Sequence, residues 1–128
     1  MEFVAIVVLL ALIEYMIFAG SAGAARAKYE VDAPATTGHP IFERRLRVQQ
    51  NTLEQLVVFI PAIWLFAIYV SQPIAAGLGL LFILGRALYS RGYVAEPSQR
   101  TLGFMITFAA QVILTLGALI GAFIRWFV

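Results

Sequence analysis

The sequence contains no cysteine and a single histidine, His39. Without cysteine the chain forms no disulfide, and any thiol chemistry must use a sulfur atom that a substrate brings. One histidine without cysteine also argues against a structural zinc site, and we expect no metal site. No stretch carries a nucleic-acid-binding signature, and we expect no nucleic-acid partner.

Charged residues are also scarce. They make up 12% of the chain, and hydrophobic residues make up 62%, against about 25% and roughly 45–50% in soluble domains. The mean hydropathy is +0.89, and a length of 128 residues allows one domain. The composition therefore predicts an all-α integral membrane protein with one domain, residues 1–128.

Four apolar stretches are long enough to span a bilayer, which takes about 20 residues. With their polar extensions, the predicted helices cover about residues 3–25, 41–70, 73–91 and 99–125. The first helix lacks a basic leader, and its apolar core exceeds the roughly 7–15 residues of a signal sequence, so we expect it to be retained. The second helix follows Pro40 and reaches roughly 45 Å, so its first turns should protrude from the membrane.

Lys and Arg gather on one side of these predicted spans. Of the nine, only Arg125 falls on the side of the termini. The other eight lie in or next to the first and third connections: Arg26, Lys28, Arg44, Arg45, Arg47, Arg86, Arg91 and Arg100. The positive-inside rule therefore predicts cytoplasmic connections and termini on the opposite side of the membrane. The same bias explains a basic pI of about 9.3.

The stretch ERRLRVQQNTLEQ, residues 43–55, is polar in an otherwise apolar chain. Arg47, Asn51 and Glu54 are spaced i, i+4, i+7 and share one helix face. Gln49 lies about 200° around the helix from Arg47 and points the opposite way. Two polar sides suit a helix end between two neighbours, one of them from another subunit. Arg44 and Arg45 are equally typical of anchors that contact lipid phosphates.

A second polar cluster is GRALYSRGYVAEPSQR, residues 85–100. Arg86, Tyr89 and Tyr93 run along one helix face, which is also typical of an interfacial aromatic belt with a snorkelling arginine. The PSQR segment predicts a helix start with Ser98 as N-cap. Arg100 then opposes the helix dipole at a cost of about 0.3–1 kcal/mol. This placement indicates an anionic ligand, and it would favour a bound thiolate.

The segments PATTGHPIFERRLRVQQNTLE and ALYSRGYVAEPSQR resemble the membrane-associated proteins in eicosanoid and glutathione metabolism, the MAPEG family. The resemblance covers nearly the whole chain. It implies a four-helix bundle assembled as a homotrimer in membrane lipid. Glutathione, the co-substrate, would bind between adjacent subunits near the cytoplasmic boundary. A lipophilic small molecule would be the second substrate.

The resemblance also implies roles by position. Arg47 would hold a glutathione carboxylate and Glu54 its ammonium group, with Asn51 in the same site, while Arg100 would be the catalytic residue that stabilises the thiolate. Further residues would line the site from the third helix or reach it from the neighbouring subunit: Arg86, Tyr89 and Tyr93 in the first group, and Arg26 and Gln49 in the second.

The predicted function is a membrane-bound glutathione S-transferase, a glutathione-dependent peroxidase, or both. It would act on lipophilic electrophiles or lipid hydroperoxides at the cytoplasmic face, of the inner membrane if the protein is bacterial. Arg100 favours an enzyme, because the lipoxygenase-activating members of the family lack that arginine. Gln55 and Ala27 depart from the leukotriene-forming members, which argues against a site built for leukotrienes.

Two alternatives stay open. One is a non-catalytic, lipid-binding member of the same family. The other is a small four-helix, proton-coupled multidrug exporter that uses Glu14, because a carboxylate in mid-membrane is functional by default. The long polar segment from Arg26 to Gln50 does not suit the short loops of such exporters.

Overall fold

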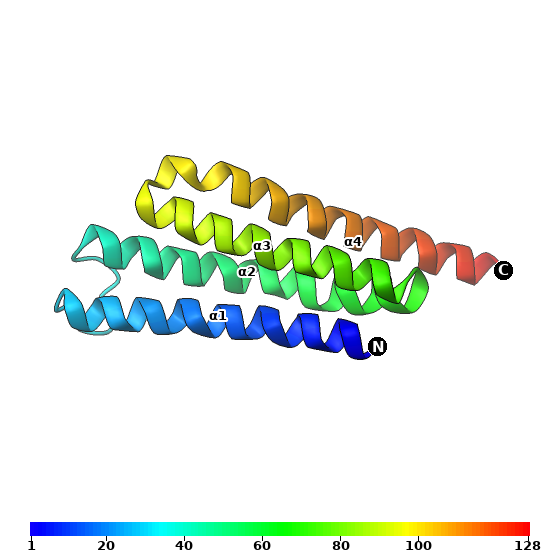
Figure 1. Ribbon diagram of the computed structural model, residues 1–128, viewed down its shortest axis with the longest axis horizontal. Helices are drawn as coiled ribbons and strands as arrows, with labels where there is room; N and C mark the ends of the chain where they lie inside the picture. The colour runs from blue at the N-terminus through cyan, green and yellow to red at the C-terminus, as the bar shows by residue number, and fades with distance from the viewer.

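The computed structural model describes residues 1–128 as four long α-helices and one short 3₁₀ helix. They are α1 (Glu2–Lys28), α2 (Pro40–Tyr69), α3 (Gln72–Ala95), η1 (Pro97–Arg100) and α4 (Thr101–Phe127). The helices alternate in direction in an elongated bundle, with the α1–α2 and α3–α4 connections at one end (Figure 1). All four long helices have the length and composition needed to cross a membrane, as predicted.

His39 and Pro40 fix the position at which α2 starts. His39 is extended and is the N-cap, and its Nδ1 accepts a hydrogen bond from Ile41 N at 3.2 Å. Pro40 occupies the first helical position, where its missing N–H costs nothing. The His39 ring also stacks on Tyr29 at the end of α1, 3.6 Å between centroids. From there α2 runs without interruption for 30 residues, through Pro61.

The predicted cap of the last helix is wrong. Ser98 makes no capping hydrogen bond, and Pro97–Arg100 form η1 before α4 begins at Thr101. Glu96 is extended, and its carbonyl accepts from Gln99 N at 2.8 Å, so the chain closes into a tighter turn than an α-helix. Ser98 lies inside that turn and is not the residue that precedes it.

The core is apolar and lies where α2 faces the other three helices. The Phe59 and Phe82 rings stack at 3.9 Å between α2 and α3, and Leu114 from α4 and Val4 from α1 are fully buried. The outward faces also carry large apolar side chains, many of them about half exposed. Such a surface suits lipid and not water.

Helices α3 and α4 approach each other closely at two glycines. A Cβ at Gly103 would collide with the backbone N of Tyr89, and one at Gly85 would lie 2.7 Å from Thr107 Oγ1. Small residues permit this contact between backbones, which is how membrane helices gain packing energy in the absence of a hydrophobic driving force.

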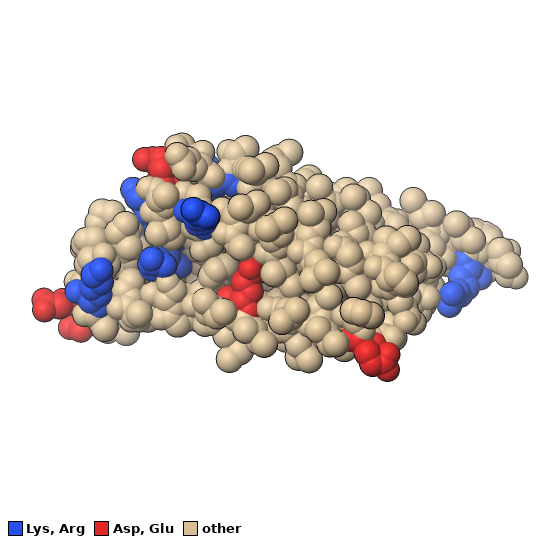
Figure 2. All heavy atoms as spheres, viewed as in Figure 1, with Lys and Arg blue, Asp and Glu red and all other residues tan.

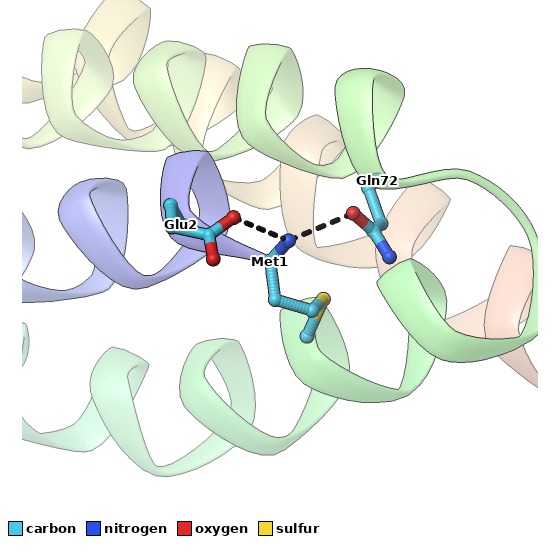
Figure 3. A network of polar contacts seen from close by, with 3 residues as sticks. All are labelled: Met1, Glu2 and Gln72. Atoms are coloured by element: carbon cyan, nitrogen blue, oxygen red, sulfur yellow. Dashed lines mark hydrogen bonds and ion pairs between the residues drawn. The ribbon is translucent and has the colours of Figure 1, made fainter.

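The start of α1 is tied to the start of α3. The Met1 ammonium donates to Gln72 Oε1 at 2.8 Å and lies 3.3 Å from Glu2 Oε2 (Figure 3). Because α1 and α3 run in the same direction (Figure 1), this exposed contact joins their first turns.

Gly103→Ala should separate α3 from α4, because the added methyl group meets the Tyr89 backbone and not a flexible side chain. We expect a loss of about 1–3 kcal/mol, measured as a lower thermal unfolding midpoint in detergent. Gly77→Ala is the matched control, because nothing lies within 4 Å of its added carbon. Equal midpoints for the two variants would contradict the close approach.

Candidate functional site at the basic end of the bundle

Basic side chains gather at the end of the bundle that holds the α1–α2 and α3–α4 connections, as Figure 2 shows on one face. Arg44 and Arg45 serve the fold there. Arg44 Nη1 donates to Val94 O at 3.1 Å at the end of α3, and Arg45 Nη1 donates to Ser21 Oγ of α1 at 2.6 Å. These two arginines therefore fasten α2 to its neighbours on either side.

Five of the predicted site residues line one pocket at this end. The pocket has a volume of about 510 Å³, within the roughly 300–1,000 Å³ typical of ligand sites, and lies between α2, α3 and the start of α4. Its lining residues are Arg47, Asn51, Tyr89, Tyr93, Arg100, Thr101 and Phe104. Cationic, phenolic and amide groups therefore converge from three helices, an arrangement suited to a polar anion.

The α2 side of the pocket follows the predicted helix face. Arg47 Nη1 lies 3.5 Å from Glu54 Oε1, and both side chains are about half exposed, so the pair is weak and open to exchange with a ligand. Asn51 is only 8% exposed, and its Oδ1 has no hydrogen-bond partner. A buried acceptor without a partner costs about 1–3 kcal/mol, a cost that a donor on a bound ligand would remove.

The α3 side is a pair of stacked phenols. The rings of Tyr89 and Tyr93 lie 5.6 Å apart and nearly parallel. Arg86 does not line the pocket, although the sequence suggested that it would lie in the site. It is fully buried, with its guanidinium 4.2 Å from the Tyr89 ring centroid and its Nη2 donating to Thr52 Oγ1 at 2.8 Å. Arg86 therefore lies behind the pocket wall.

Arg100, unlike Arg47, makes no ion pair within the chain. Its side chain is exposed, and its one hydrogen bond, from Nη1 to Pro97 O, is long at 3.5 Å. Thr101 and Phe104 follow it in the lining, and neither was predicted from the sequence. Phe104 lies one helical turn beyond Arg100, so the same i, i+4 rule that was applied to α2 could have found it.

Besides Arg86, three predicted residues are absent from the pocket lining, namely Glu54, Arg26 and Gln49, although Glu54 pairs with Arg47 at its edge. Arg26 Nη1 donates to Ala35 O at 2.7 Å, and its guanidinium lies 4.7 Å from the centroid of the Phe42 ring. Gln49 is partly buried on another face of α2. Within one chain, neither residue faces the pocket that holds Arg47 and Arg100.

An apolar groove continues along the α2 face below the pocket. It encloses about 420 Å³ between α2 and α4. Its lining residues are Val58, Pro61, Ala62, Leu65, Tyr69, Thr115, Ala118, Leu119 and Ala122. Because Glu54 and Val58 are one turn apart, the face of α2 that is polar at the basic end becomes apolar as it enters the groove.

Comparison with known proteins identifies relatives of the chain. Residues 4–120 match the MAPEG family model. The chain is 49% identical to an uncharacterised protein of Synechocystis sp. over 116 residues, 91% of this chain and 85% of that protein. It is 45% identical to microsomal glutathione S-transferase 2 of Homo sapiens over 103 residues, 80% and 70% of the two chains. Identity to leukotriene C4 synthase of Bos taurus is 37% over 76 residues, 59% and 51% of the two chains.

Thr52→Val tests whether Arg86 is anchored from α2. The change keeps the side-chain shape but removes the one hydroxyl that accepts from the Arg86 guanidinium. We expect a lower thermal midpoint, from a loss of about 1–3 kcal/mol. Thr107→Val is the control, because Thr107 is equally buried and its hydroxyl bonds only Gly103 O of its own helix. Equal losses would contradict the anchoring.

Proposed function

Because this chain belongs to the MAPEG family, we propose that it is a membrane-bound glutathione S-transferase, with glutathione-dependent peroxidase activity on lipid hydroperoxides. The observation that carries this proposal is the convergence of Arg47, Asn51, Tyr89, Tyr93 and Arg100 on one pocket. The protein is an integral membrane protein with four helices able to span the bilayer. We place the pocket at the cytoplasmic face, of the inner membrane if the protein is bacterial, because the basic residues lie there.

The pocket chemistry supports glutathione as the ligand. Glutathione carries carboxylates at both ends, an ammonium group and internal amides. Arg47 would bind a carboxylate, and Glu54, now 3.5 Å from Arg47, would bind the ammonium. The unpartnered Asn51 Oδ1 would accept a hydrogen bond from an amide N–H. The Tyr89 and Tyr93 hydroxyls would supply further polar contacts in the same pocket.

Arg100 would stabilise the thiolate. A nearby guanidinium favours the charged form of a thiol and lowers its pKa from about 8.5 to roughly 3.5–7.5. The thiolate would then form a new S–C bond with an electrophilic carbon and displace the leaving group. With a hydroperoxide, the thiolate would attack the terminal peroxide oxygen, break the O–O bond and release the alcohol, which leaves glutathione as its sulfenic acid. The thiol of a second glutathione would then attack the sulfenic sulfur, release water and yield glutathione disulfide.

The apolar groove would hold the lipophilic reactant. It shares the α2 face with the pocket and is open to the membrane-facing surface between α2 and α4. Holding both reactants along one helix face supplies proximity, because a bimolecular step becomes effectively unimolecular.

We also propose a homotrimer in which each pocket is completed by the adjacent subunit. Arg26 and Gln49 lie away from their own chain's pocket. A neighbouring subunit packed against the other side of α2 would use them toward its own bound glutathione, as the family resemblance implies.

Arg100→Ala should lower kcat for conjugation of glutathione to an aryl halide by about 100-fold or more, with little change in the glutathione Kd. The reason is that thiolate stabilisation matters in the transition state more than in ligand binding. Arg91→Ala is the matched control, an exposed arginine of the same end outside the pocket. Equal losses in kcat and affinity would contradict the role of Arg100. Tight glutathione binding by the unsubstituted protein, without any turnover, would instead identify a non-catalytic binder.

Co-expression of Gln49→Glu and Arg100→Ala chains tests the shared site. Each variant alone should be nearly inactive, because a carboxylate at position 49 repels the glutathione carboxylates. Mixed assemblies should regain activity, since some sites combine an intact Arg100 with an intact Gln49 from the neighbour. Activity no higher than the mean of the two variants would contradict a site built by two subunits.

A further inference from the structure

Arg86 is a cation buried within the bundle and outside the pocket. It is 0% exposed and has one hydrogen bond, to Thr52, while its Nε and Nη1 have no partner. Stacking against the Tyr89 ring satisfies the guanidinium face but not these N–H groups. A buried charge is costly unless it has a counter-charge, so the bundle must provide one.

The register of α1 against α3 indicates where that counter-charge lies. The two helices run in the same direction, and Val7 packs so closely on Gly79 that a Cβ there would collide with it. Seven residues further along each helix, close to two full turns, come Glu14 on α1 and Arg86 on α3. Equal steps from a shared contact bring these two residues to the same level on the facing sides of the helices.

The environment of Glu14 matches this position. Its Oε1 is buried and has no hydrogen-bond partner, like the two Arg86 nitrogens. The two side chains make no direct ion pair, since the ion pairs of the chain are Met1–Glu2 and Arg47–Glu54. An attraction between them would act without direct contact, and it would be weakly screened in a medium of low dielectric constant.

We propose that Glu14 is the counter-charge of Arg86 and, through Arg86, a positioning residue for Tyr89 in the pocket wall. The Arg86 guanidinium lies 4.2 Å from the Tyr89 ring centroid, and Tyr89 lines the pocket, so a charge that holds the guanidinium in place also supports the pocket wall. The charge pair stands on the fold alone, whereas its effect on ligand binding rests on the proposed glutathione function.

This assignment gives Glu14 a role other than proton transport. A carboxylate in mid-membrane is expensive, and here it offsets an equally expensive cation two helices away in the sequence. The Tyr89 ring lies between that cation and the pocket, so a displaced guanidinium would shift the phenol that the ligand meets.

A double-mutant cycle on the full-length protein without ligand tests the pair. Glu14→Gln should lower the thermal midpoint in detergent by about 5 °C or more, because it leaves a buried cation unpaired. In the Arg86→Met background the same change should have a much smaller effect. Glu2→Gln removes an exposed carboxylate from the same helix and should leave the midpoint unchanged.

The outcomes of the cycle separate clearly. A folded Glu14→Gln/Arg86→Met protein supports the pair even where Glu14→Gln alone fails to fold. Equal destabilisation by Glu14→Gln in both backgrounds, or an unfolded double variant, would overturn it.

Glutathione affinity tests the positioning step. Glu14→Gln should raise the glutathione Kd by roughly 10-fold to 100-fold, and Glu14→Asp, which keeps the charge, should restore most of the affinity. A lower midpoint with an unchanged Kd would overturn positioning and leave the charge pair. If the unsubstituted protein binds no glutathione, the proposed function fails while the ligand-free cycle still reports on the pair.

Discussion

The close approach of α3 to α4 is the contact on which the rest of the basic end depends. Gly103 lies against the Tyr89 backbone, and Gly85 lies against Thr107. Only with the two backbones this close do the α3 phenols and Arg100 border the same pocket. The geometry of the site therefore depends on this packing, because any added side chain that pushes α4 away from α3 also moves Arg100 away from α2.

The second organising feature is that one face of α2 borders both the polar pocket and the apolar groove. At the basic end it presents Arg47 and Asn51 to a polar pocket, and further along it presents apolar side chains to the groove against α4. Because α2 is one continuous helix, the residues that line the pocket and those that line the groove lie along the same helix face. A charged, water-soluble reactant and a lipophilic one can thus meet along a single helix face, at the boundary where their solvents meet.

Much of this arrangement could be predicted from the sequence. Apolar runs located the four helices, and helical spacing put Arg47 and Asn51 on one face, where the pocket lies. Of the details that failed, one is a local turn and the other depends on packing between helices. The turn before α4 is set by the extended Glu96 and Pro97, so Ser98 does not cap the helix. Arg86 is buried because neighbouring helices cover it. Residue spacing along α3 alone cannot predict that burial.

The proposed chemistry requires that the Arg100 guanidinium, at the start of α4, holds a glutathione sulfur as an anion. The direct measurement is an ultraviolet titration of thiolate absorbance for glutathione bound to the detergent-purified protein. We expect thiolate at neutral pH in the unsubstituted protein and in Arg91→Ala, and an ordinary thiol pKa in Arg100→Ala. The same thiolate signal in Arg100→Ala would contradict it.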